Sequence, residues 1–225
     1  RIKIMGNMDI AESRRPQDGR ILFEMNDDRL DLRVSTYPTL YGEKSVLRLL
    51  NISDAMHDLD GLGFEKGILK RFEDMLIGGE GIILVSGPTG SGKTTTLYST
   101  LNKMDNPDVN IVTIEDPIEY DLDNINQAQV NRRSGVTFAS ALRAILRQDP
   151  DIIMVGEVRD EETVELAIRA ALTGHLVFST IHTNDSAAGF TRLLNWGMEP
   201  FLITSTVKGI LAQRLVRKLC KECRE

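Results

Sequence analysis

The sequence has few cysteines, few aromatic residues and no long hydrophobic run. Its 225 residues include only two cysteines, both close to the C-terminal end, whereas a disulfide-stabilised secreted domain spreads its cysteines along the chain. No apolar run approaches the roughly 18 residues of a membrane-spanning helix, and the first residues carry no signal-peptide pattern. These absences indicate an ordinary globular protein of the cytoplasm.

An excess of positive charge is missing as well. The chain has 27 Lys and Arg against 33 Asp and Glu, so its formal net charge is -6, and aromatic residues make up 5% of it. Such a composition gives no general attraction to nucleic-acid phosphates and few rings on which bases could stack. We therefore expect no nucleic-acid partner, with a local basic patch as the open alternative.

The two cysteines form a Cys-x-x-Cys pair, Cys220 and Cys223. This spacing is half of a structural zinc site, which needs four ligands. The alternatives are two free thiols or, less favoured without a thioredoxin-like context, a redox pair. The chain starts at Arg1 without an initiator methionine and stops two residues after the pair, so we expect a piece of a longer protein. We expect zinc in that full-length protein and none in this chain.

The hydrophobic pattern divides the chain into two regions. Residues 1–50 read as strands and turns, with an alternation at Leu30–Val34 that is typical of a half-buried strand, and polar residues 51–61 predict a linker. From 62 to 225, aliphatic runs alternate with helical patterns. These runs suit parallel strands covered on both faces, so we predict an α/β doubly wound domain with strands at 82–85, 111–114, 152–155 and 176–181.

One motif specifies a nucleotide site. Residues 87–94 fit Gly-x-x-x-x-Gly-Lys-Thr between a predicted strand and a predicted helix, and glycines there let backbone N–H groups wrap phosphates. Lys93 should reach the β- and γ-phosphates of ATP, and Thr94 should bind Mg²⁺. The predicted nucleotide contacts are Gly87, Pro88, Thr89, Gly90, Ser91, Gly92, Lys93, Thr94 and Thr95. A glycine-rich turn without a ligand is the alternative. The motif alone does not separate an ATPase motor from a small-molecule kinase or a GTPase.

Carboxylates follow two of the predicted strands, where a P-loop enzyme needs them to hold the metal and orient water. The strand at 111–114 runs into Glu115-Asp116-Pro117-Ile118-Glu119, and the strand at 152–155 runs into Gly156-Glu157. Gly156 stands where many P-loop enzymes have aspartate, so Glu157 would serve the metal directly or through water. A solvated acidic loop is the alternative for residues 115–119.

Histidines and arginines supply further candidates. His175 and His182 flank the strand at 176–181, and His182 could polarise the γ-phosphate; the alternative for each is a structural hydrogen bond. Four arginines are either solvated surface residues or arginine fingers that reach a nucleotide, in a ring across the subunit boundary. They are Arg33 and Arg48 on the N-terminal strands, and Arg143 and Arg147, four apart on a helix predicted at Thr137–Arg147.

In their order along the chain, these motifs resemble those of the ATPases of type II secretion and type IV pilus assembly. The resemblance covers essentially the whole chain. It rests on the phosphate loop and on Arg15–Arg20, Glu115–Glu119, Arg147–Asp151, Gly156–Asp160, Thr173–His175, His182–Asn184 and Ala212–Leu215.

The resemblance implies a RecA-like P-loop core at 62–225, which ends in the first half of a tetracysteine zinc motif. Residues 1–50 would be the C-terminal part of a small, truncated N-terminal α+β domain that is PAS-like. Subunits would form a homo-hexamer with ATP bound where a subunit's two domains meet. The motor would lie in the cytoplasm, peripheral to the inner membrane, and would act on a polytopic inner-membrane platform protein, in some members through an adaptor protein.

By the same resemblance, Glu119 is the candidate catalytic carboxylate and Glu157 the metal-side carboxylate, with Glu115 also near the nucleotide. His175 and His182 would lie near the phosphates, and the four arginines would contact the nucleotide or couple subunits. The cysteine pair resembles the zinc module of assembly and secretion members rather than retraction members. Two other functions stay open: a nucleic-acid translocase with a related core, and a nucleotide-binding scaffold that does not hydrolyse ATP.

Overall fold

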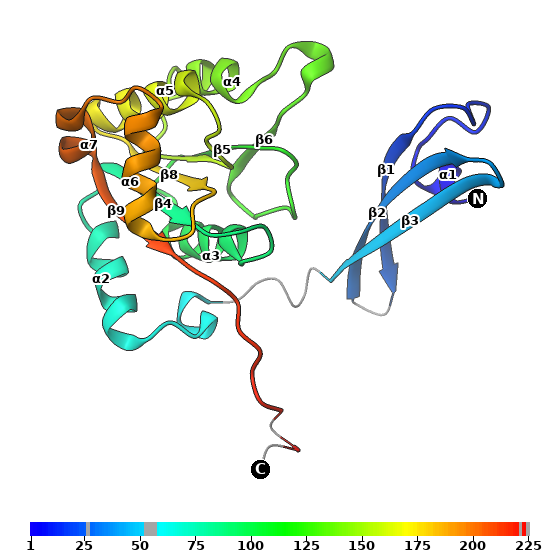
Figure 1. The fold of residues 1–225 in the computed structure, drawn as a ribbon, viewed down its shortest axis with the longest axis horizontal. Helices are drawn as coiled ribbons and strands as arrows, with labels where there is room; N and C mark the ends of the chain where they lie inside the picture. Colours follow the sequence, from blue (N-terminus) through cyan, green and yellow to red (C-terminus); the bar gives the residue numbers. More distant parts are fainter. Residues whose placement is uncertain (26–27, 52–57, 221, 224–225) are drawn as a thin grey trace. The chain divides into compact units, whose positions relative to one another are not determined.

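The computed structural model describes residues 1–25, 28–51, 58–220 and 222–223. It divides into two compact units, Arg1–Met56 (the N-terminal unit) and His57–Glu225 (the core unit), which Figure 1 draws with their secondary structure. Most of the linker predicted at 51–61 lies outside the described residues. We therefore describe each unit by itself.

The N-terminal unit is a three-stranded antiparallel sheet with one short helix. The sheet has the order β1-β2-β3, and the helix α1 packs on β1. On one face of the sheet, the side chains of Ile21 and Val34 pack with Met8. The segment Leu30–Val34 does lie in a strand, but its burial does not follow the alternation, because the charged Asp31 is fully buried and paired with Arg20. The elements are α1 (Ile2–Met5), β1 (Gln17–Met25), β2 (Asp28–Thr39) and β3 (Gly42–Asn51).

The core unit is built on a six-stranded sheet in which all neighbouring strands are parallel. Its order is β6-β5-β7-β8-β4-β9. The four predicted aliphatic runs form its four central strands, which are fully buried. The α/β prediction is therefore confirmed. The strands are β4 (Gly81–Ser86), β5 (Ile111–Glu115), β6 (Asn126–Gln129), β7 (Ile152–Val155), β8 (Leu176–Ile181) and β9 (Val207–Ala212).

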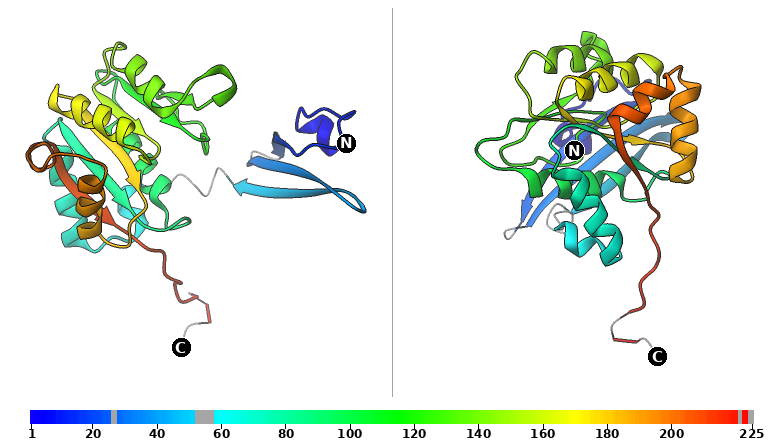
Figure 2. Two further views of the ribbon diagram at one scale, coloured as in Figure 1. Left: turned by 45° about the horizontal axis from the view of Figure 1, so that its top comes forward. Right: turned by 90° about the vertical axis from the view of Figure 1, so that its left-hand side faces the viewer.

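Helices cover both faces of this sheet, as Figures 1 and 2 show. One face packs against α2 (Lys66–Leu76) and α3 (Lys93–Met104), and a 3-10 turn, η1 (Leu59–Leu62), packs on α3. The other face packs against α4 (Phe138–Ile145), α5 (Glu161–Leu172), α6 (Ser186–Asn195) and α7 (Pro200–Thr206). A second 3-10 turn, η2 (Arg132–Ser134), precedes α4. None of the helices in the described part of the chain is long and apolar enough to cross a membrane.

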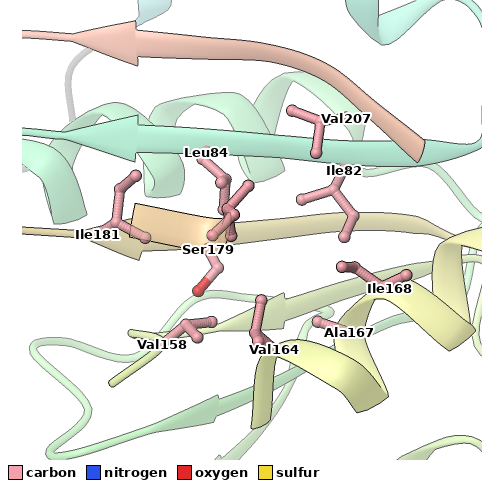
Figure 3. A pocket seen from close by; sticks show the side chains of 10 residues that line it. Ile82, Leu84, Val158, Val164, Ala167, Ile168, Ser179, Ile181 and Val207 are labelled. Carbon is pink, nitrogen blue, oxygen red and sulfur yellow. The ribbon is translucent and has the colours of Figure 1, made fainter. Parts of the chain in front are cut away.

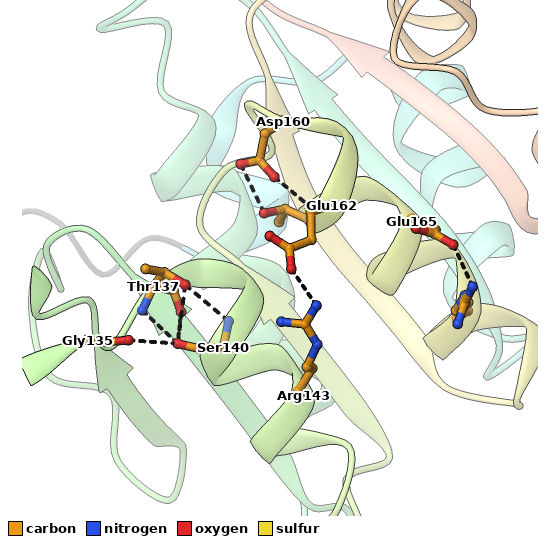
Figure 4. Close-up of polar contacts among 9 residues, drawn as sticks. Gly135, Thr137, Ser140, Arg143, Asp160, Glu162 and Glu165 are labelled. Carbon is orange, nitrogen blue, oxygen red and sulfur yellow. Dashed lines mark hydrogen bonds and ion pairs between the residues drawn. The ribbon is translucent and has the colours of Figure 1, made fainter.

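Capping side chains fix the starts of the helices α4 and α5 (Figure 4). The Asp160 carboxylate accepts a 2.8 Å hydrogen bond from the backbone N–H of Thr163, and two glutamates follow in the first turn of α5. Thr137 and Ser140 form a reciprocal capping box at the start of α4. The helix α4 ends at Ile145, two residues before the end that the sequence predicts.

A small pocket lies between the sheet and α5 (Figure 3). Its lining is aliphatic apart from Ser179, whose hydroxyl donates a 2.7 Å hydrogen bond to the Val155 carbonyl. A pocket without free polar groups does not suit a phosphate, so this pocket belongs to the hydrophobic core.

The core sheet should carry most of the stability of the core unit. We predict that Ile153→Ala lowers the free energy of unfolding by about 2–5 kcal/mol, because the Ile153 side chain in the central strand β7 is fully buried and its loss leaves a cavity. Ile77→Ala is the matched control, since that side chain is 82% exposed. Urea unfolding of both variants measures the difference, and equal midpoints would contradict it.

Candidate functional site

The phosphate loop, residues 87–92, joins the end of β4 to the start of α3. Gly87 and Gly92 have φ angles of +152° and +85°, which other residues rarely adopt. A Cβ atom on Gly87 would lie 2.5 Å from the Gln213 carbonyl oxygen and 2.5 Å from Ser91 Oγ, so only glycine fits. Thr94 and Thr95 lie half-buried in the first turn of α3. The loop therefore has the backbone that phosphate binding by N–H groups requires.

The Lys93 side chain lies within this loop. Its Nζ donates hydrogen bonds to the carbonyl oxygens of Gly87 at 2.8 Å and Pro88 at 3.0 Å. Burial lowers the pKa of Lys93, and the nearby Glu157 carboxylate opposes this shift. The buried Oγ of Ser91 has no hydrogen-bond partner among the described residues. A buried ammonium group held only by carbonyls, beside an unsatisfied hydroxyl, fits an anionic phosphate.

Glu157 and His182 lie beside Lys93. Glu157 follows β7, and its Oε2 lies 2.6 Å from Arg159 Nε and 3.6 Å from His182 Nε2. Burial and the positive charge of Lys93 lower the pKa of His182, against the opposing effect of Glu157. The Ser86 hydroxyl at the end of β4 donates a 2.9 Å hydrogen bond to the Thr183 carbonyl and so holds the turn that carries His182. The structure thus brings three predicted site residues together.

Glu115 is not available to a nucleotide. Its side chain is 3% exposed, and its carboxylate accepts hydrogen bonds from Thr113 Oγ1 at 2.7 Å, from Gln127 Nε2 at 3.1 Å and from the Tyr98 hydroxyl. Burial raises the pKa of Glu115, and these hydrogen bonds oppose the shift. The side chain is thus enclosed within this chain, and its contacts give no support for the predicted contact between Glu115 and a nucleotide.

Glu119 lies on the loop that follows Glu115. Its side chain is half-buried, and its backbone N–H donates a 3.2 Å hydrogen bond to the Tyr98 hydroxyl. Asp116 on the same loop is exposed and lies 3.5 Å from Arg132. The acidic stretch therefore has an exposed part and a part that is fixed to the core, and Glu119 belongs to the fixed part.

His175 does not lie near the phosphate loop. Its carbonyl accepts a 3.0 Å hydrogen bond from Gly81 at the start of β4, whereas the loop begins after the end of β4. His175 Nδ1 lies 2.8 Å from the Ala170 carbonyl, at the C-terminal end of α5. The structure therefore does not bring His175 to the phosphate loop of this chain, because the six-residue strand β8 separates it from His182 by about 20 Å. Its place near a phosphate stays a prediction.

The structure locates the four arginines in two groups. In the core unit, Arg143 pairs with Glu162 (Figure 4), and Arg147 donates a 2.5 Å hydrogen bond to the Arg143 carbonyl. In the N-terminal unit, Arg33 on β2 and Arg48 on β3 are directly opposite each other. Their role as arginine fingers stays a prediction.

Cys220 and Cys223 are exposed free thiols. Over residues 1–25, 28–51, 58–220 and 222–223, no three His, Cys, Asp or Glu side chains are grouped so that they could hold a metal ion. The structure therefore gives no support for zinc, and the binding of Mg²⁺ by Thr94 and Glu157 stays a prediction.

Gln213 is a site residue that the sequence did not predict. Its side chain hydrogen-bonds to the phosphate loop. Its Nε2 donates a 2.8 Å hydrogen bond to the Ser91 carbonyl, and its Oε1 accepts one of 2.9 Å from Thr96 Oγ1. Its backbone N–H donates a 2.9 Å hydrogen bond to the Ser86 carbonyl. Gln213 follows β9, 122 residues after Ser91. Only the pairing of β9 with β4 reveals this contact.

Comparison with known proteins identifies the family. The family model described as "Type II/IV secretion system protein" matches residues 1–225. The chain belongs to this family. Both the resemblance stated from the motifs and the fold that it implies are confirmed.

Three relatives within the family are similar over nearly the whole chain. Type II secretion system protein HxcR of Pseudomonas aeruginosa is 56% identical over 224 residues, which cover 100% of this chain and 48% of the relative. Type II secretion system protein E of Xanthomonas campestris is 57% identical, over 97% of this chain and 39% of the relative. Type IV pilus assembly ATPase PilB of Thermus thermophilus is 53% identical, over 99% of this chain and 25% of the relative. The chain spans half or less of their length.

Solved structures support the same family. A crystal structure of the pilus retraction motor PilT with bound ADP has a TM-score of 0.78 and 35% identity, over 92% of this chain and 61% of that chain. The Legionella pneumophila ATPase DotB has a TM-score of 0.73 and 28% identity, over 90% of this chain and 58% of that chain. The fold of this secretion-family chain is thus that of known motor ATPases.

The contacts of Gln213 generate a prediction. Gln213→Ala should weaken the binding of an ATP analogue by up to about thirtyfold, because two hydrogen bonds that shape the phosphate loop are lost at about 1 kcal/mol each. The matched control is Gln148→Ala, an exposed amide in the turn after α4. Fluorescence titration measures both dissociation constants. An equal affinity in the two variants would exclude a role for Gln213 in shaping the loop.

Proposed function

We propose that the protein carrying this chain is an ATP-hydrolysing subunit of a hexameric motor, which powers type II protein secretion or type IV pilus assembly at the inner membrane. One observation carries the proposal: Lys93, Glu157 and His182 meet at the phosphate loop of a chain that belongs to the secretion family. Relatives named as a pilus assembly ATPase and a type II secretion system ATPase support it.

In the proposed reaction, the loop's backbone N–H groups bind the phosphates of ATP. Lys93 then exchanges its two carbonyl partners for the β- and γ-phosphate oxygens, and its charge stabilises the transition state. Mg²⁺, when bound, would be held by Thr94 and Glu157 and would neutralise charge on the transferred phosphoryl group. His182, whose pKa is lowered by burial and by the charge of Lys93, can donate a hydrogen bond towards the γ-phosphate. Glu119 orients the attacking water.

The proposal for the oligomer and its partners also rests on the family resemblance. Subunits form a homo-hexamer, and Arg33 and Arg48 reach a nucleotide together with Arg143 and Arg147, within a subunit or across its boundary. The motor lies on the cytoplasmic side, acts on a polytopic inner-membrane platform protein, directly or through an adaptor, and needs no nucleic acid. Zinc binds only in the full-length protein, where Cys220 and Cys223 would gain two further ligands. Stimulation of ATP turnover by DNA would favour a nucleic-acid translocase instead.

Two variants should distinguish the hydrolysis of ATP from its binding. Glu119→Gln should keep ATP binding and lower turnover by about 10²–10⁴-fold, because the amide cannot orient water as a carboxylate does. Lys93→Ala should lose both, because the loop loses the only cation within it. Lys66→Ala, an exposed lysine on α2, is the control. Phosphate release and nucleotide titration are the measurements, and normal turnover by Lys93→Ala would remove the mechanism.

The arginine proposal predicts an effect in assembled rings. Arg33→Ala should impair hydrolysis there, by about 10³-fold or more if it acts as an arginine finger. Mixed with Lys93→Ala subunits, it should recover turnover, because an intact arginine then faces an intact phosphate loop in some neighbouring pairs. Arg71→Ala, an exposed arginine on α2, controls for loss of charge. No recovery in any mixture would argue against action across the boundary.

A further inference from the structure

Tyr98 is a fully buried tyrosine with an unusual position. It lies on α3, five residues after Lys93 and on the helix that starts at the phosphate loop. Its hydroxyl donates a hydrogen bond to Glu115 Oε2 and accepts one of 3.2 Å from the backbone N–H of Glu119. One phenol therefore connects the phosphate-loop helix to the end of β5 and to the residue proposed to orient water.

Tyr120, at the other end of the acidic loop, contacts the same Tyr98 side chain. The rings of Tyr98 and Tyr120 meet edge to face, with centroids 4.6 Å apart and planes at 78°. Glu115 precedes the segment 116–119 and Tyr120 follows it, so Tyr98 contacts the residues on both sides of the segment. A displacement of the segment would have to break a buried hydrogen bond or the ring contact.

Two glutamines complete the attachment. Gln127 Oε1 accepts a 2.7 Å hydrogen bond from the Leu122 N–H, and its Nε2 donates one of 3.3 Å to the Tyr120 carbonyl. Gln129 Oε1 accepts a 3.2 Å hydrogen bond from the Ile118 N–H. These bonds fix the loop to β6. Tyr98 adds a bond to the same segment from the phosphate-loop helix.

The protonation states of the two tyrosines agree with these hydrogen bonds. Burial and the Glu115 carboxylate raise the pKa of Tyr98, so the phenol keeps its proton and remains a donor to Glu115. Its oxygen then has a lone pair for the Glu119 N–H. Burial also raises the pKa of Tyr120 to about 12. Both rings stay neutral over the range in which an ATPase works.

We propose that Tyr98 is a positioning residue, which fixes Glu119 relative to the phosphate loop by bridging the Glu115 carboxylate and the Glu119 backbone N–H. The inference rests on the proposed function, in which Glu119 orients the attacking water. Binding of ATP depends on the phosphate loop itself, so Tyr98 acts on the hydrolytic step and not on affinity.

The test is Tyr98→Phe in the assembled full-length protein. We expect kcat to fall about ten- to a hundredfold, because the Glu119 backbone N–H loses its hydrogen bond to the Tyr98 hydroxyl, while the KM for ATP does not change. The matched control is Thr113→Val, which also removes a buried hydrogen bond to Glu115 but leaves the Glu119 contact intact. Thermal unfolding of both variants reports the structural cost, and only Tyr98→Phe should lower kcat.

A double-mutant comparison shows whether Tyr98 acts through Glu119. Single-turnover rates should be the same for Glu119→Gln and for Glu119→Gln combined with Tyr98→Phe, because a positioning residue has no effect once its target is lost. A further drop in the double variant, or an equal loss of kcat in Thr113→Val, would overturn the proposal. Wild-type kcat in Tyr98→Phe with an inactive Glu119→Gln would overturn it and leave the proposed function intact. Normal turnover in Glu119→Gln would instead remove the proposed role of Glu119.

A measurement on the unaltered protein covers the case in which Tyr98→Phe fails to fold. The Glu119 backbone N–H should exchange slowly with deuterium, because it is bonded to a buried phenol. Exchange at Glu119 as fast as at the exposed neighbour Asp116 would overturn the proposal.

Discussion

Parallel pairing of the four central strands is the constraint on which the rest of the core unit depends. Since β4, β5, β7 and β8 run in one direction, their C-terminal ends meet at one edge of the sheet. The phosphate loop, the acidic loop, Glu157 and the turn of His182 all follow these ends. Functional residues that are spread over about 95 residues of sequence therefore lie close together there. A side chain at the N-terminal ends of the strands lies far from them.

Much of the fold and part of the site could be predicted from the sequence. The aliphatic runs identified the central strands, because strands buried on both faces need apolar side chains at every position. Lys93 could be located because its motif states both the residue types and their place between strand and helix. Glu157 and His182 could be named because each comes directly after a predicted strand.

The candidates that the structure does not bring to the phosphate loop share a physical cause: the end of the strand at which a residue lies and the depth of its side chain. His175 and His182 lie at opposite ends of the same strand, so the length of that strand keeps them apart. Glu115 and Glu119 are both acidic and close in sequence, yet one ends a buried strand and the other lies on the loop beyond it. Gln213 belongs to the family motif Ala212–Leu215 but was not named as a site residue, because its contact depends on an edge strand that pairs with β4 late in the chain.

The position of Gln213 has a practical consequence for work on fragments. The phosphate loop rests against residue 213, which lies beyond the last strand, and the side chain of Leu215 approaches Gly92. A recombinant fragment that stops before this residue would keep the phosphate loop, the acidic loop, Glu157 and His182. It would also lack the support that shapes the loop. Domain boundaries drawn for expression therefore need to extend past Leu215, even though the segment there has no regular secondary structure.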